Sequence, residues 1–251
     1  MRIAIVSDIH GNRTAFEAVL NDLRQTSPDL ILHGGDLAHG GASPAEIVDR
    51  IRDLGWPGVV GNTDEMLFRP ESLTEFASRL PQLQSMWAAI AEMAEADREA
   101  LGEERLGWLR GLPRVQIHGP MSLVHASPDD LWRAPAPEAS DGELGSVYSP
   151  LGQPIAIYAH IHQSYVRSLS VPGASELTVV NTGSVSLSYD GDRRAAYLLL
   201  DGLNPLLDKR NPSIRRVEYD VDRELKALAA CGFPHSAWMT KILESARPQM
   251  P

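Results

Sequence analysis

The chain of 251 residues lacks the features of a membrane-spanning, secreted or disulfide-bonded protein. It contains no run of about 18 apolar residues, which a membrane-spanning helix requires, and Met1 is not followed by the basic flank and apolar stretch of a secretion signal. Its one cysteine, Cys231, excludes an intramolecular disulfide. We therefore expect a cytoplasmic protein with no membrane partner.

Positive charge is also scarce. The 23 lysine and arginine residues face 33 aspartate and glutamate residues, for a net charge of −10. A general nucleic-acid binder takes much of its affinity from basic side chains on phosphates, so nucleic acid is not an expected general partner. A small phosphorylated substrate is compatible with this balance, because divalent cations would compensate local carboxylates. The sequence gives no sign of the oligomeric state.

The first part of the chain predicts an α/β fold. Strands are predicted at Arg2–Ser7, Asp29–Leu32 and Gly58–Val60, where short apolar segments rich in β-branched residues end in polar loops. Helices are predicted after Asn12 and Ser43, which are typical N-cap residues. In such units, sites lie beyond the carboxyl ends of the strands.

The rest of the chain predicts helices and then a second sheet. Residues 66–112 have apolar positions at helical spacing and would form a helical lid or small subdomain. A polar, proline-rich loop is predicted from Ala126 to about Gly152. We expect one domain over residues 1–251. The later strands are predicted at 114–117, 121–125, 155–158, 165–169, 177–180, 195–200 and 215–219, and the last helices at 221–231 and 236–246.

Five short segments each place a possible metal ligand at the end of a predicted strand. Carboxylate, amide oxygen and imidazole groups suit Mn²⁺, Fe²⁺, Zn²⁺, Co²⁺ or Ni²⁺. A single residue of this kind is more often a cap or a satisfied polar group, so the prediction depends on the order and spacing of all five. The segments are Asp8-Ile9-His10, Gly35-Asp36, Gly61-Asn62, His125 and His160-Ile161-His162.

The spacing within these segments predicts pairs of ligands. Alternate side chains of an extended segment point the same way, so Asp8 with His10, and His160 with His162, would each present two ligands to one location. Two cations about 3.5–4 Å apart need a bridging carboxylate. Asp36 is the best candidate. We therefore predict a centre of two divalent ions per chain, without assigning the metal.

The order of these motifs resembles that of the calcineurin-like metallophosphoesterase superfamily. The resemblance runs from Met1 to about Tyr219. Three local motifs, Asp8-Ile-His-Gly-Asn12, Gly35-Asp-Leu and Asn181-Thr-Gly-Ser-Val185, look like those of the bacterial and archaeal single-domain phosphodiesterases and phosphatases. The resemblance implies a four-layer α-β-β-α sandwich of two mixed sheets with a helical lid insertion.

The resemblance also implies a function and a set of ligands. The expected reaction is hydrolysis of a phosphodiester or phosphomonoester, in which a hydroxide bridging two metals attacks phosphorus. Asp36 and Asn62 would belong to the catalytic centre, and Asn62 would also contact substrate. The implied ligands are Asp8, His10 and His162 for one ion, Asn62, His125 and His160 for the other, and Asp36 between them.

One position departs from the family pattern. Many members have a histidine after Gly-Asn that protonates the leaving group, but this chain has Thr63. Threonine is no general acid at neutral pH, although one branch of the family also lacks this histidine. His39 is the hypothetical substitute. Asn12 and Arg13 are candidate phosphate contacts, with helix capping and a solvated helix residue as the respective alternatives.

Other functions stay open from the sequence alone. The chain would also suit a protein or nucleotide phosphatase. A further alternative is a metal- or nucleotide-binding regulatory module with little turnover, because the ligands are complete while the usual acid is missing.

Overall fold

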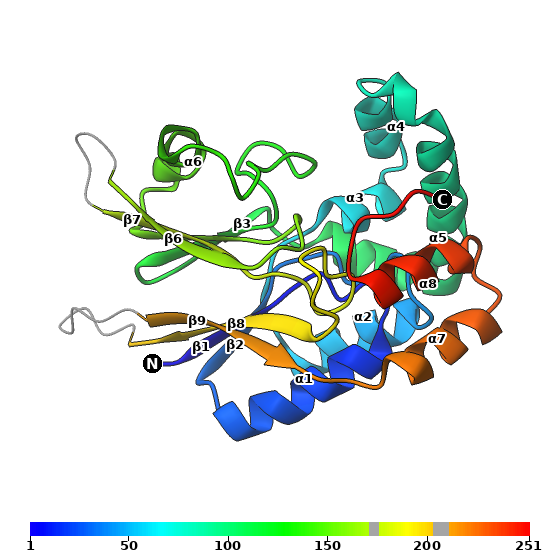
Figure 1. Ribbon diagram of the computed structural model, residues 1–251, viewed down its shortest axis with the longest axis horizontal. Helices are drawn as coiled ribbons and strands as arrows, with labels where there is room; N and C mark the ends of the chain where they lie inside the picture. The colour runs from blue at the N-terminus through cyan, green and yellow to red at the C-terminus, as the bar shows by residue number, and fades with distance from the viewer. Residues whose placement is uncertain (171–175, 203–210) are drawn as a thin grey trace.

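Two mixed β-sheets packed face to face form the centre of the molecule (Figure 1). The computed structural model describes residues 1–170, 176–202 and 211–251. In the first sheet β1 pairs parallel to β2 and antiparallel to β8, which pairs antiparallel to β9. Its strands, in order across the sheet, are β2 (Leu30–His33), β1 (Ile3–Val6), β8 (Ala195–Asp201) and β9 (Asn211–Val217).

The second sheet has a parallel centre and antiparallel edges. β4 pairs parallel to β5 and β5 pairs parallel to β7, whereas the outer strands β3 and β6 run antiparallel to their neighbours. The order is β3 (Val115–His118), β4 (Met121–Val124), β5 (Ile155–Tyr158), β7 (Leu177–Asn181) and β6 (Tyr165–Leu169).

The side chains of β1 point alternately to the two faces of the first sheet, and this alternation creates the layers of the sandwich. Ile3 and Ile5 are fully buried in the cluster between the two sheets, together with residues such as Leu123 of β4. Ala4 and Val6 point the other way and are buried against the helices. A strand with both faces buried needs apolar residues at every position, which is why β1 reads as an unbroken apolar run.

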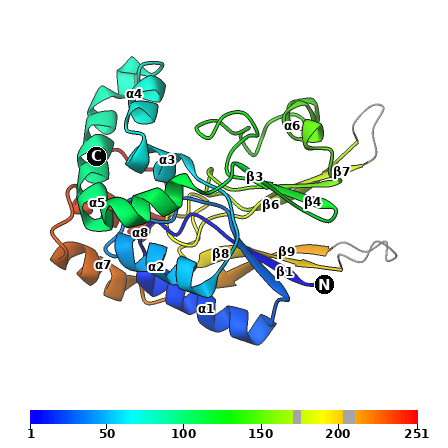
Figure 2. The same cartoon turned by 180° about the vertical axis from the view of Figure 1, so that it is seen from behind.

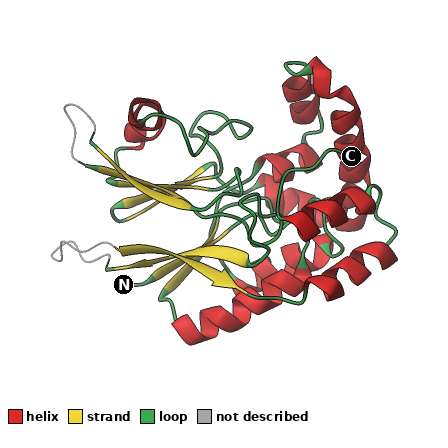
Figure 3. Cartoon of the chain, viewed as in Figure 1, coloured by secondary structure: helices red, strands yellow, loops and turns green. Residues whose placement is uncertain are grey.

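Helices cover the outer faces of the sandwich and confirm the predicted four-layer architecture (Figures 2 and 3). α1 (Arg13–Thr26) and α2 (Pro44–Leu54) lie on the first sheet, and α6 (Asp141–Tyr148) lies on the second. Asn12 caps α1, because its side chain accepts the N–H of Ala15 at 2.9 Å.

The remaining helices stand at one end of the sandwich, beyond the carboxyl ends of the strands (Figure 1). Gly102, with φ 67°, interrupts α5. In the described ranges, no helix combines the length and apolar character needed to cross a lipid bilayer. These elements are α3 (Asn62–Phe68), α4 (Glu71–Ala77), the 3₁₀ turn η1 (Pro81–Leu83), α5 (Gln84–Arg110), α7 (Val221–Ala230) and α8 (Ser236–Ser245).

Three predicted elements were wrong in kind or extent. Gly58–Val60 is no strand, since only Gly58 forms a bridge, to His33, while the N–H of Val60 donates to Pro113. The predicted loop at 126–152 contains α6 and the 3₁₀ turn η2 (Ser149–Leu151), because Ser140 caps a helix whose apolar side chains pack on the second sheet. β9 spans 211–217 rather than 215–219.

Candidate metal centre

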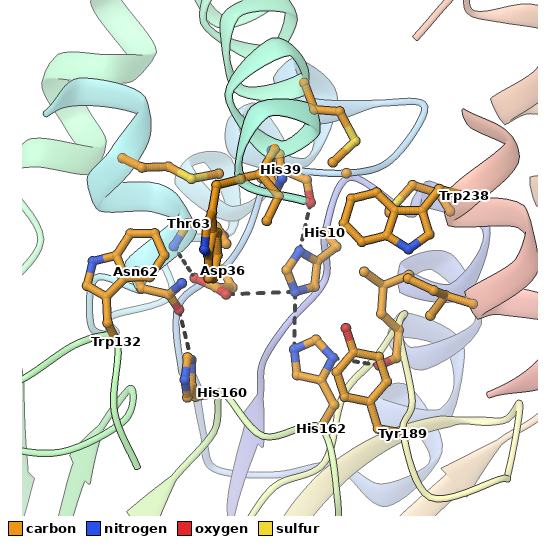
Figure 4. A pocket seen from close by; sticks show the side chains of 18 of the residues that line it. His10, Asp36, His39, Asn62, Thr63, Trp132, His160, His162, Tyr189 and Trp238 are labelled. Carbon is orange, nitrogen blue, oxygen red and sulfur yellow. Dashed lines mark hydrogen bonds and ion pairs between the residues drawn. The ribbon is translucent and has the colours of Figure 1, made fainter. Parts of the chain in front are cut away.

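The five predicted ligand segments converge at the carboxyl ends of the strands. Figure 4 shows His10, Asp36, Asn62, His160 and His162 of four of these segments directed toward one another. Parallel strands bring the residues that follow them to the same edge, so positions distant in sequence become neighbours. Asp8 and His10 follow β1, Asp36 follows β2, Asn62 begins α3, His125 follows β4, and His160 and His162 follow β5.

One group of side chains lies beside the end of β1. Asp8, His10, Asp36 and His162 are buried, and each brings a ligand atom within 4.8 Å of the others. His162 Nε2 lies 3.2 Å from Asp8 Oδ1 and 3.3 Å from His10 Nε2. Asp36 Oδ2 lies 3.8 Å from His10 Nε2.

A second group lies on the other side of Asp36. Asn62 Oδ1 is 2.9 Å from both His125 Nε2 and His160 Nδ1. Asp36 Oδ1 is 3.5 Å from His125 Nε2, while its other oxygen faces His10. The Asp36 carboxylate therefore directs one oxygen to each group.

Backbone carbonyls select the tautomer of three of these histidines. A carbonyl only accepts a hydrogen bond, so the ring Nδ1 that contacts it must carry the proton and donate it. In the neutral ring the Nε2 lone pair is then directed to the cluster, which is the form that binds a metal. The contacts are His10 to His39 O at 2.7 Å, His125 to Gly34 O at 2.8 Å, and His162 to Leu187 O at 2.5 Å.

The polar groups of this site fit divalent cations. Within the described residues, neither buried carboxylate oxygen of Asp8 accepts a hydrogen bond. An unpaired buried carboxylate is costly. The Nε2 atoms of His10 and His162, 3.3 Å apart, are two acceptors facing each other when both rings are neutral. A cation bound between these three side chains removes both conflicts.

Five of the seven predicted ligands have a left-handed rather than an extended backbone. Non-glycine residues seldom adopt positive φ, and clusters of such residues are associated with functional sites. The predicted reason for the convergence of Asp8 with His10, alternation along an extended segment, was therefore wrong. Tight turns after the strands direct these side chains instead. The φ values are 54° for Asp8, 49° for His10, 53° for Asp36, 66° for His160 and 56° for His162.

Charges in the site favour a carboxylate at Asp36. Burial opposes its ionisation, but His125 and His10 outweigh burial and hold the pKa of Asp36 well below its usual range. Burial also opposes a charge on His125, yet Asp36 raises the pKa of His125 to about 9. Burial lowers the pKa of His10 and of His160 to about 4, so both rings are neutral at pH 7.

Comparison with known proteins agrees with this arrangement. The profile of the calcineurin-like phosphoesterase superfamily domain matches residues 1–204. The chain belongs to the calcineurin-like phosphoesterase superfamily. Members of this family depend on divalent metals, and the buried Asp/His cluster of this chain has suitable donors.

Three proteins similar to this calcineurin-like protein come from bacteria and archaea. An uncharacterized protein of Methanocaldococcus jannaschii is 30% identical, with 96% of each chain covered. The metallophosphoesterase structure from Sphaerobacter thermophilus is 25% identical with a TM-score of 0.76, and the match covers 98% of this chain and 100% of that one. A symmetrical bis(5′-nucleosyl)-tetraphosphatase of Methylococcus capsulatus is 30% identical over 150 residues, covering 59% of this chain and 50% of the relative.

A cavity of about 340 Å³ opens over the metal centre of this phosphoesterase family member. Five of the seven predicted metal ligands line it, namely His10, Asp36, Asn62, His160 and His162. The other walls come from the helices at the end of the sandwich and from loops, and their side chains are mostly aromatic or aliphatic (Figure 4). They include Met66, Phe76, Trp87, Ile90, Met93, Trp132, Leu187, Tyr189, Trp238, Met239 and Ile242.

His39 lines this cavity and is held by an acid that the sequence did not reveal. Its Nδ1 lies 2.8 Å from Asp97 Oδ2, and the Asp97 side chain is fully buried in α5. Asp97 stands in a helical stretch rich in alanine and glutamate, where an acidic residue is usually solvated. No sequence signal distinguishes it.

Asn12 and Arg13 do not line the cavity. The Asn12 side chain caps α1 and donates to Ser186 Oγ at 3.1 Å. Arg13 pairs with Glu17 and Glu46, both at 2.8 Å, on the surface of the molecule. The structure thus brings the seven predicted metal ligands together and leaves these two predicted phosphate contacts apart from them.

Proposed function

We propose that the protein is a phosphoester hydrolase that uses two divalent metal ions. The observation that carries the proposal is the position of Asp36, whose two carboxylate oxygens face two separate groups of ligands. One ion would be held by Asp8, His10 and His162, and the other by Asn62, His125 and His160, with Asp36 shared between them. When bound, the metals would supply an activated water and neutralise charge on the phosphoryl group.

The chain's own residues position the ligands and the substrate. Asn62 Oδ1 is directed to the two histidines, which leaves its Nδ2 to donate to a phosphoryl oxygen. The mostly apolar walls would lower the polarity around a bound phosphoryl group and so strengthen the electrostatic interactions with it. Residues 66–112 supply much of this wall, which supports their role as a lid.

His39 is our proposed proton donor to the leaving group. Thr63 stands at the cavity wall but carries no proton available at neutral pH. His39 lies at the same cavity, and its Nδ1 donates to the buried Asp97, so its Nε2 is the nitrogen left to serve the substrate. Asp97 would act through His39, by fixing the ring orientation.

A second candidate is a nucleotide phosphatase. The relative from Methylococcus capsulatus, named as a bis(5′-nucleosyl)-tetraphosphatase, favours it, although the match covers only half of that protein. Protein phosphatase activity and a regulatory module that binds metal without turnover are the remaining alternatives.

Metal content and activity test the proposal together. Purified protein loaded with Mn²⁺ should contain close to two ions per chain and hydrolyse 4-nitrophenyl diesters or monoesters. Asp36→Asn should lose both properties, whereas Asp53→Asn, at an exposed position of α2, should lose neither. Two bound ions with no hydrolysis of any ester, under several metals, would favour the regulatory module. Full activity of Asp36→Asn would exclude the bridging role.

A further inference from the structure

We infer that the substrate is a phosphodiester with a single negative charge and one bulky, ring-sized apolar ester group. This inference rests on the proposed phosphoesterase function and adds the substrate class. It comes from the walls of the cavity that face the ligand residues. Those walls are mostly apolar, and none of the described residues in them is lysine or arginine.

Three aromatic rings from separate segments pack against one another on one side of the cavity. Phe76 of α4 stacks on Trp132, with ring centroids 5.0 Å apart and planes 24° apart. Phe76 also meets the edge of Trp87 of α5, with centroids 5.6 Å apart and planes at 85°. Because these rings already support one another, an apolar group bound against them loses little affinity to side-chain ordering.

Two of the three indoles that line the cavity already use their N–H groups within the protein, whereas the Nε1 of the third, Trp132, is buried without a hydrogen-bond partner among the described residues. Trp87 Nε1 donates to Leu80 O at 3.2 Å, and Trp238 Nε1 donates to Gln249 O at 2.8 Å. Both indoles therefore offer carbon surface to a ligand. A sugar or nucleobase needs partners for its polar edges, since unpaired polar groups lose their hydration on burial. An apolar group has no such need.

The described lining of the cavity also contains no permanently charged basic side chain. None of the described residues that line it is lysine or arginine. Arg69, Arg79 and Arg114 line a neighbouring cavity on the other side of Phe76 and Trp132, where Glu65 and Glu75 accompany them. Two divalent ions against the carboxylates of Asp8 and Asp36 would leave a charge of plus two. This charge suits one phosphodiester group, but a polyphosphate chain would extend into apolar surroundings.

The volume of the cavity supports the same substrate class, and its wall includes residues of the C-terminal helix α8. Its volume of about 340 Å³ lies near the lower end of the range of small-molecule sites, about 300–1,000 Å³, and so fits a phosphoryl group with one ring system. Trp238 and Met239 line the cavity from α8, beyond residues 1–204 that match the family profile. Part of the wall is thus supplied by a segment outside the residues that the family profile matches.

Two phosphonates that differ only in one group test this inference. Methyl phenylphosphonate and methyl methylphosphonate are both monoanions and poor substrates, so calorimetric titration of the metal-loaded protein reports binding alone. The phenyl compound should bind about tenfold more tightly or better, as burial of a ring predicts. Trp87→Ala and Trp132→Ala should each bring the two affinities closer. Trp108→Ala, on α5 but lining another cavity, should leave the ratio unchanged.

The possible outcomes separate this inference from the proposed function. Equal affinity of the wild-type protein for both phosphonates would overturn the inference, even if the same protein hydrolyses diesters. A preference that persists in both Trp87→Ala and Trp132→Ala, with thermal unfolding showing folded variants, would also overturn it. A preference for the phenyl compound without hydrolysis of any ester would instead count against the proposed function.

Discussion

The carboxylate of Asp64 accepts the backbone N–H of Asp36 at 2.8 Å, so one buried acid holds the backbone of another. Asp64 also accepts the N–H groups of Leu37 at 2.9 Å and Gly61 at 3.0 Å. Burial and the nearby Asp36 carboxylate raise the pKa of Asp64 to about 6, although the backbone donors oppose that shift. Asp64 thereby connects the loop that carries Asp36 to the start of α3, which carries Asn62.

Asp64→Asn should weaken metal binding without removing a ligand. The amide keeps one oxygen for the backbone but turns an N–H₂ group to the remaining donors, so the Asp36 loop loses part of its support. Outer partners of metal ligands are worth about 10–100-fold in affinity. Titration of the metal-free protein with Mn²⁺ should show a loss in this range, and excess metal should restore activity. Unchanged affinity would show that Asp64 supports only the fold.

Gly61→Ala should displace the Asp36 side chain. A β-carbon at Gly61 would overlap Asp36 Oδ1 and lie 2.5 Å from Asp36 N. We expect a loss of about 1–3 kcal/mol in the free energy of unfolding, as for overpacked sites, and weaker metal binding. The matched control is Gly107→Ala, where an added β-carbon meets nothing within 4 Å. This change in helix α5 should stabilise the protein by about 0.5–1 kcal/mol. If both variants had the same free energy of unfolding and the same metal affinity, the close packing at Gly61 would be contradicted.

His39→Ala should slow the reaction only where the leaving group needs a proton. With an alkyl ester, loss of a general acid should lower kcat by about 10²–10⁴-fold, whereas a 4-nitrophenyl ester should react almost as before. Asp97→Asn should also lower kcat on the alkyl ester, but by a smaller factor, and should alter the pH–rate profile. The effect is smaller because His39 keeps its position at the cavity. An unchanged pH–rate profile of His39→Ala on the alkyl ester would eliminate His39 as the acid.

Asp22→Asn should destabilise the protein at neutral pH, independently of the metal centre. Burial opposes the charge of Asp22, but hydrogen bonds from Arg215 and Tyr197 hold its pKa below the ordinary value of 3.8. Because the pKa is lowered in the folded state, the stabilisation is present above 3.8 and is lost as the pH falls through the folded-state pKa. At pH 7 the free energy of unfolding of Asp22→Asn should be about 1–3 kcal/mol below that of wild type.

Denaturant unfolding of the Asp22→Asn variant at pH 7 and at pH 3 checks this dependence. The difference in the free energy of unfolding between the variant and wild type should be smaller at pH 3 than at pH 7. Asp53→Asn, at an exposed position of α2, is the control and should match wild type at both pH values. A difference that does not change with pH would mean that the charge of Asp22 contributes nothing.

Local features of the sequence were enough to predict where the candidate metal ligands lie. A short β-branched apolar run such as Ile3–Val6 favours a strand buried on both faces, and the polar residues after such a strand lie at the edge of the sheet. The same holds for Asp36 after β2 and His125 after β4. The left-handed turns at Asp8 and His10 left no comparable signal, because their geometry depends on backbone contacts to the loop at 35–37.

Residue types at short spacing were sufficient to predict the α/β class, the order of the predicted ligand segments and the family resemblance. Other contacts of the site become visible only in the folded chain: Asp97 beneath His39, Asp64 behind Asp36, and the aromatic wall of Phe76, Trp87 and Trp132. Such contacts join segments distant along the chain. Each residue looks ordinary in its own helix or loop, and its surroundings are set by the packing of the others.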